Sequence, residues 1–155
     1  MADHPEYHSA VTESARRMRV IVVHIGLIIV AVGSLLPWVT IGGRERSGPG
    51  LANASLGLAD LGFETLLSGF GYGWYAIPIA GLIAWVSLWR QFPPAPDTAT
   101  ATFAAILLVA ALFFGVVVIR GPFAGSHIGV VITLIGAAVA FVGCRYPLAR
   151  PKQVT

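Results

Sequence analysis

Apolar residues gather in four long uncharged runs that are separated by short polar segments. The runs cover about residues 20–39, 72–89, 102–119 and 127–144, and none of them contains Lys, Arg, Asp or Glu. A bilayer core about 30 Å thick needs about 20 apolar residues in a helix that rises about 1.5 Å per residue. Because every backbone amide in a membrane needs an internal partner, the pattern predicts an all-α membrane protein with a bundle of four transmembrane helices.

The composition agrees with this class of protein. The 155 residues are 56% hydrophobic and 11% charged, with a mean hydropathy of +0.79, whereas a soluble domain carries about 25% charged residues. An ordinary soluble globule and a disordered chain are therefore excluded. A disulfide scaffold is excluded as well, because Cys144 is the single cysteine.

The basic residues predict the orientation of the helices. Seven of the ten flank one side of the predicted bundle, namely Arg16, Arg17, Arg19, Arg90, Arg145, Arg150 and Lys152. Because cytoplasmic flanks accumulate Lys and Arg, we expect both termini to lie in the cytoplasm. The chain then divides into a tail at 1–19, one transmembrane domain at 20–144 and a tail at 145–155. The pI of about 9.5 follows from these flanks, and we expect no nucleic-acid partner.

A cleaved signal peptide is the alternative interpretation of the N-terminal region. Its apolar core would be residues 20–39, which is longer than the usual 7 to 15 or so. The sequence therefore favours a retained first helix.

The connection at residues 40–71 is the longest polar segment, and we expect it on the outer side. Its first part is rich in Gly and Pro and predicts turns. Its second part, residues 51–70, predicts a short amphipathic helix with an acidic face, although two short strands around residues 56–63 are an alternative. We expect this loop either to bind a partner or to form a lid over the bundle. The residues of the expected partner surface are Arg44, Arg46, Asp60, Phe63 and Glu64.

Small residues recur at seven-residue spacing along the predicted helices. In lipid, helices associate through close backbone approach at such positions, and a spacing of seven keeps them on one stripe of a left-handed bundle. The expected packing residues are Gly26, Gly33, Ala80, Gly115, Gly129, Gly136 and Gly143.

Two histidines are the candidate polar sites of the transmembrane domain. His24 lies inside the first apolar run and His127 begins the fourth. An intramembrane ionisable residue is a functional candidate, but a proton relay would need a carboxylate at similar depth, and no run contains one. We expect His24 to hydrogen-bond to a neighbouring helix or to water. His127 could pair with Asp60 or Glu64 and so dock the outer loop.

Motifs that carry known chemistry are missing from the sequence. It has no cysteine pair, zinc motif, P-loop, G-x-S-x-G element or paired intramembrane carboxylates. Paired haem histidines at matched depth are missing as well. We therefore expect no enzymatic activity, no catalytic residues, no cofactor and no metal.

An Arg-flanked first helix ends in the element Leu36-Pro37-Trp38 and is followed by the segment GLADLGFE in a Gly-rich loop. With its helices of Ala, Val, Gly, Leu and Ile, the chain resembles the small four-helix membrane proteins of actinobacteria, most of which have no assigned activity. The resemblance implies a multi-pass protein of the bacterial plasma membrane, and it transfers no functional residue.

Three functions are compatible with these features. The leading hypothesis is a non-enzymatic assembly or accessory subunit of a larger membrane complex, in contact with lipid and with a membrane-protein partner. An alternative is a homo-oligomeric transport or pore-forming component, which would need a polar stripe along one helix; Ser34, Ser87 and Thr133 are scattered and form no such stripe. A third hypothesis is a receptor or immunity module that works through residues 40–71.

Overall fold

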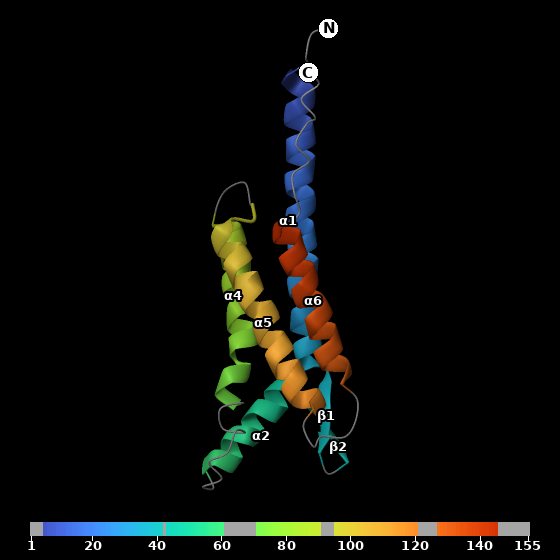
Figure 1. Ribbon diagram of the computed structural model, residues 1–155, viewed down its shortest axis with the longest axis vertical. Coiled ribbons are helices and arrows are strands. Elements are labelled where there is room, and N and C mark those ends of the chain that lie inside the picture. The colour runs from blue at the N-terminus through green and yellow to red at the C-terminus, as the bar shows by residue number, and fades with distance from the viewer. Residues whose placement is uncertain (1–4, 42, 61–70, 91–94, 121–126, 146–155) are drawn as a thin grey trace.

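The computed structural model describes residues 5–41, 43–60, 71–90, 95–120 and 127–145, and it is mostly helical (Figure 1). The elements in chain order are α1 (Pro5–Leu35), β1 (Pro37–Ile41), β2 (Arg44–Ser47), α2 (Gly48–Asp60), α4 (Ala76–Trp89), α5 (Thr98–Arg120) and α6 (Ile128–Arg145). Residues 71–74, directly before α4, are helical as well.

Four helical segments are long and apolar enough to cross a membrane. They are Thr12–Leu35, Gly71–Trp89, Thr98–Arg120 and Ile128–Arg145. Large apolar side chains such as Ile28, Leu82 and Val109 point outward and are 60–66% exposed. An exposed apolar surface of this kind is what lipid contact requires. The prediction of four helices long and apolar enough to span a membrane is therefore confirmed, and such helices are typical of a multi-pass membrane protein.

The four long helices do not form an evenly closed bundle. α1 packs along α6, α6 packs on α5, and α5 packs on α4, while α1 and α4 contact each other only sparsely (Figure 1). Each helix runs antiparallel to the next in this order, so α1 near Arg19 lies beside the end of α6. We call this the arginine end, after Arg19, Arg90 and Arg145, and we call the opposite end, with β1 and β2, the hairpin end.

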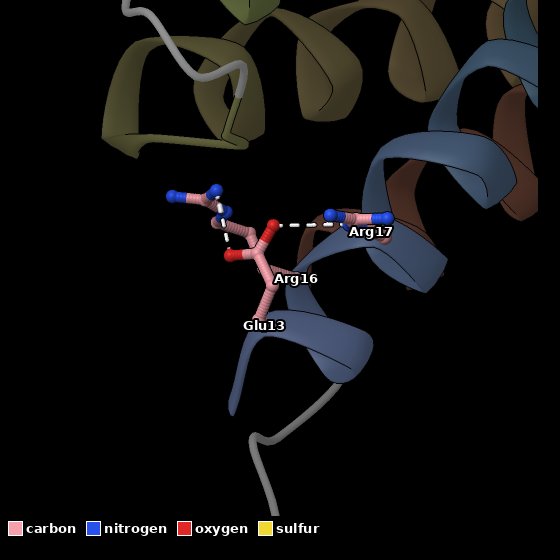
Figure 2. Close-up of polar contacts among 3 residues, drawn as sticks. All are labelled: Glu13, Arg16 and Arg17. Atoms are coloured by element: carbon pink, nitrogen blue, oxygen red, sulfur yellow. Dashed lines mark hydrogen bonds and ion pairs between the residues drawn. The ribbon is translucent and has the colours of Figure 1, made fainter. Parts of the chain in front are cut away.

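The first turns of α1 extend beyond the other helices at the arginine end (Figure 1). Two ion pairs link successive turns there: the Glu13 carboxylate lies 2.7 Å from Arg16 Nη2 and 3.0 Å from Arg17 Nε (Figure 2). Pairs at i,i+3 and i,i+4 each stabilise a helix by a few tenths of a kcal/mol, about 0.2–0.5. They support this part of α1 where it has few tertiary contacts.

The first apolar run is not helical to its end, so the predicted helix over 20–39 is wrong at its C-terminus. α1 ends at Leu35, and Pro37 begins β1. Proline lacks the N–H that a helix needs and disfavours helical geometry in the residue before it. The extension of α1 back to Pro5 goes beyond the start near residue 20 that the apolar run predicts.

Part of the expected turn region forms an antiparallel hairpin. Val39 pairs with Arg46, Thr40 with Glu45, and the connection contains Gly43 at φ 75°, where glycine is favoured because it has no Cβ. α2 then begins at Gly48, earlier than the expected amphipathic helix, and it occupies residues 56–60, which excludes strands there. Residues 61–70, the remainder of the expected helix, lie outside the described residues.

α5 begins at Thr98, one turn before the expected start at 102, because Asp97 caps it. The Thr100 backbone N–H and the Thr100 hydroxyl both donate to Asp97 Oδ1, at 2.7 and 2.8 Å. This is the usual contact of an N-cap side chain with the third helical residue. The bond from the Thr100 N–H, with further bonds from Thr100, holds the pKa of the Asp97 carboxyl below its ordinary value.

Replacing Asp97 with Ala removes this cap and should destabilise the protein by about 1 kcal/mol. Asp97→Asn keeps an acceptor oxygen and serves as the matched control.

The cap also predicts a pH dependence. Because folding lowers the pKa of Asp97, the ionised carboxylate contributes in full to the stability of the fold above the ordinary aspartate pKa of about 3.9. The contribution is lost as the pH falls through the folded-state pKa. Thermal unfolding in detergent, followed by circular dichroism at pH 7 and pH 3, measures both effects; equal melting of all three proteins at pH 7 would contradict the cap.

Candidate functional site

The α1–α6 contact is a seam of facing glycines. A Cβ added at Gly26 would lie 2.4 Å from the backbone N of Ala140 and 2.7 Å from the carbonyl O of Gly136. A Cβ added at Gly136 would lie 2.6 Å from the backbone N of Val30 and 2.7 Å from the carbonyl O of Gly26. Real Cβ atoms do not approach backbone atoms this closely, so the two helices can meet here only because both residues are glycine.

The seam continues in both directions from this pair. Toward the hairpin end, a Cβ on Gly33 would meet Thr133, and toward the arginine end a Cβ on Gly143 would meet Val22 and Val23 at 2.9–3.0 Å. The Thr133 hydroxyl is buried and has no hydrogen-bond partner among the described residues. A Cβ added at Gly33 would lie 2.6 Å from this oxygen, so the hydroxyl fits here only because residue 33 is glycine.

The remaining small residues of the predicted set also face the interior of the chain. A Cβ on Gly115 of α5 would lie 3.0 Å from a Val130 methyl group of α6, and Ala80 of α4 is buried. Gly129 of α6 lies under the Trp38 indole. A Cβ added at Gly129 would lie 2.4 Å from the indole Cδ1. All seven predicted packing residues therefore make contacts within the chain.

Trp38 joins the hairpin to the helices at the hairpin end. The side chain is fully buried, and its Nε1–H donates to the Gly33 carbonyl at 3.1 Å, which satisfies a carbonyl in the last turn of α1. The Trp38 carbonyl in turn accepts a hydrogen bond from His127 Nδ1 at 3.0 Å. His127 therefore contacts β1. The carboxylates of Asp60 and Glu64, with which the sequence suggested a pairing, lie outside the described residues.

Further contacts attach α2 and α4 to this end. Trp74 packs edge-on against Trp38 and against Tyr75, with ring centres 6.1 and 5.5 Å apart. A Cβ on Gly48 would lie only 2.4 Å from the Trp74 ring, so α2 begins directly on this indole. The Tyr75 hydroxyl donates to Asn53 Oδ1 at 3.0 Å, which links α4 to α2.

The expected partner surface is described in part. Arg44 and Arg46 are exposed on β2, with the exposed Glu45 between them. Asp60 is the last residue of α2, and its side chain is not among those that the structure describes. Phe63 and Glu64 lie outside the described residues. The exposed charges of β2 are thus the part of this surface that the structure locates.

His24 forms a hydrogen-bonded link between α1 and α4 near the arginine end. Trp89 Nε1 donates to His24 Nε2 at 2.9 Å, and the two rings meet edge-on. The other ring nitrogen, Nδ1, lies 2.9 Å from the Val20 carbonyl O. Because an indole N–H only donates and a carbonyl only accepts, the network requires a neutral imidazole with its proton on Nδ1.

A groove opens where α1 and α4 contact each other sparsely. Its volume is about 570 Å³, and it runs from the middle of both helices toward the hairpin end. The walls are almost entirely apolar: Leu27, Ile28, Val30, Ala31, Ser34, Leu35, Pro49, Trp74, Tyr75, Pro78, Gly81, Leu82 and Trp85. The Ser34 hydroxyl is satisfied by the Val30 carbonyl at 2.8 Å, so the groove offers an apolar surface.

Gly81 of α4 leaves open space in the wall of this groove. A Cβ added there would meet no atom of the described residues within 4 Å, although glycine within a helix costs up to about 1 kcal/mol relative to alanine. The sequence reasoning missed Gly81 because it lies outside the seven-residue stripe of α4, which contains Ala80. A glycine in the middle of an apolar helix was the available signal.

Other chemistry has little support in the described part of the chain. No group of three or more His, Cys, Asp or Glu side chains there could hold a metal ion. Cys144 is a free, buried thiol in the last turn of α6. No family model, curated protein or solved structure matches the chain.

The glycine seam predicts opposite effects for one substitution at two sites. Gly136→Ala places a methyl group against α1 backbone atoms, so we expect a loss of about 1–3 kcal/mol or more. Gly81→Ala, the matched control, adds the same group in open space and should stabilise the helix by up to about 1 kcal/mol. Unfolding of both variants in one detergent, compared with the parent protein, tests this; equal effects would exclude the seam.

The His24 network predicts a single imidazole tautomer. We expect the nitrogen chemical shifts of labelled His24 to show a protonated Nδ1 and an unprotonated Nε2 at pH 7. Trp89→Phe keeps a ring but removes the donor, so it should shift the Nε2 resonance, while Trp85→Phe on the same helix should leave it unchanged. A protonated Nε2 in the parent protein would contradict the link to Trp89.

Proposed function

We propose that the protein is a non-enzymatic accessory or assembly subunit of a larger membrane complex, and that its α1–α4 groove receives a transmembrane helix of the partner. The proposed location is the bacterial plasma membrane, with both termini in the cytoplasm, as the distribution of Arg and Lys predicts. The single observation that carries the proposal is the unfilled space above Gly81 in an apolar, lipid-accessible groove.

The physical argument rests on how helices associate in lipid. Apolar side chains gain little by leaving other hydrocarbon, so association depends on close packing at small residues. The glycines of the seam meet this requirement within the chain and leave little of their surface for a partner. Gly81 and Ala31 are small residues that line the groove, so the backbone of another helix can approach α4 there.

The hairpin end supplies a second surface for the same partner. Arg44, Glu45 and Arg46 are exposed on β2, beside the α2 segment that borders the groove at Pro49. Charges of both signs outside the apolar span favour one orientation of an incoming helix over others. The apolar groove would then supply contact area, and the hairpin would supply selectivity.

Gly81→Leu tests the proposal, because it fills the groove without touching the seam. Ala76→Leu is the matched control: it adds similar bulk to an exposed position of α4 that does not line the groove. The tagged proteins are purified from the native membrane in mild detergent and examined by native mass spectrometry. A photocrosslinking residue at Leu82 identifies what occupies the groove.

We expect a stoichiometric second protein, crosslinked through Leu82, that is retained by Ala76→Leu and lost from Gly81→Leu. The loss should occur without a lower melting temperature. A partner that both variants retain would contradict the role of the groove. A homo-oligomer without a second protein would contradict the accessory role and would favour the transport or pore-forming alternative.

A further inference from the structure

A second cavity, with polar walls, lies at the arginine end between the start of α5, α1 and the end of α6. Its volume is about 510 Å³. Arg19 of α1 and Arg145 of α6 line it together with Asp97, Thr98 and Thr102 at the start of α5, and small apolar side chains complete the wall. This cavity is separate from the α1–α4 groove and shares no lining residue with it.

Arg19 is held in place by the end of α6. Its Nη2 donates to the Cys144 carbonyl at 2.5 Å, and its Nε lies 3.4 Å from the Gly143 carbonyl. These carbonyls belong to the last turn of the helix, where no intrahelical donor reaches them. A guanidinium has five N–H donors, so Arg19 keeps further donors that have no partner among the described residues. The side chain is therefore both fixed and able to bind an anion.

Arg145 adds a second positive charge at the same cavity. It is exposed, and its guanidinium carbon lies 5.7 Å from the centre of the Phe141 ring. Among the described residues, neither Arg19 nor Arg145 forms an ion pair with a carboxylate. Asp97, the acidic residue of the cavity, accepts two hydrogen bonds from Thr100 and caps α5.

The cavity lies where the uncharged run of α1 begins and α6 ends, which is where lipid headgroups are expected. Arg19 directly precedes the uncharged run that begins at Val20, and Arg145 is the last residue of α6. Basic pockets between helices at this level are typical sites for the headgroups of anionic lipids. Arginine binds phosphate through parallel N–H···O bonds and is more weakly hydrated than lysine.

We propose that this cavity binds the phosphate of an anionic phospholipid, with Arg19 and Arg145 as its ligands. The phosphate oxygens accept hydrogen bonds from both guanidinium groups, and the hydroxyl groups of Thr98 and Thr102 border the polar headgroup. The acyl chains follow the exposed apolar surface of α5, where Ile106 and Val109 face outward. The site does not depend on a protein partner or on the direction in which the chain crosses the membrane.

Lipid binding to the full-length protein in detergent tests the proposal. Phosphatidylglycerol is titrated against phosphatidylcholine, and bound lipid is counted by native mass spectrometry. Arg145→Gln should weaken the binding of phosphatidylglycerol about tenfold or more, as expected when a hydrogen bond to a charged group is lost. Arg120→Gln removes the same charge from the far end of α5 and should leave binding unchanged.

A second variant separates charge from geometry. Arg19→Lys keeps the positive charge but loses the planar fork, so it should also weaken binding; circular dichroism verifies that it is folded. Equal affinity for the two lipids, or equal loss in Arg145→Gln and Arg120→Gln, would overturn the proposal. Displacement of phosphatidylglycerol by millimolar inorganic phosphate would identify a site for free phosphate and would overturn the assignment to a lipid.

Discussion

Close backbone contact between α1 and α6 is the constraint on which the rest of the structure depends. Surrounding lipid gives apolar helices little reason to associate, so the helices must gain from direct packing. At Gly26 and Gly136 each helix occupies the volume that a side chain would fill in the other. The large apolar side chains are consequently directed outward, and α5 and α4 are added successively to the side of α6.

The structure of the hairpin end follows from the point at which the α1–α6 contact stops. α1 ends at Leu35, two residues after Gly33, because Pro37 cannot continue a helix. Trp38 then folds back, lies on Gly129 and bonds to the Gly33 carbonyl. The hairpin is thus attached to both helices of the seam. Its indole contacts Trp74, and the start of α2 packs on the Trp74 ring.

The four spans could be predicted because the bilayer thickness fixes the length of an apolar helix, and the uncharged runs show that length directly. The end of α1 could not be predicted from hydrophobicity, since Trp38 and Val39 are apolar whether they face lipid or the interior of a hairpin. The glycines at seven-residue spacing were visible in the sequence, but their partners were not, because Gly26 and Gly136 meet only in the folded chain. The same holds for the Trp89 bond to His24 and for the groove beside Gly81.

The pairing of the first long helix with the last has a consequence for how the protein is made. Arg19 and Cys144, which meet at the arginine end, are 125 residues apart, and a ribosome adds about 5–20 residues per second. About 6–25 s therefore pass between the synthesis of α1 and the completion of α6. During this time α4 and α5 can already pair. During that interval the glycine face of α1, which packs against α6 in the folded chain, has no α6 to contact.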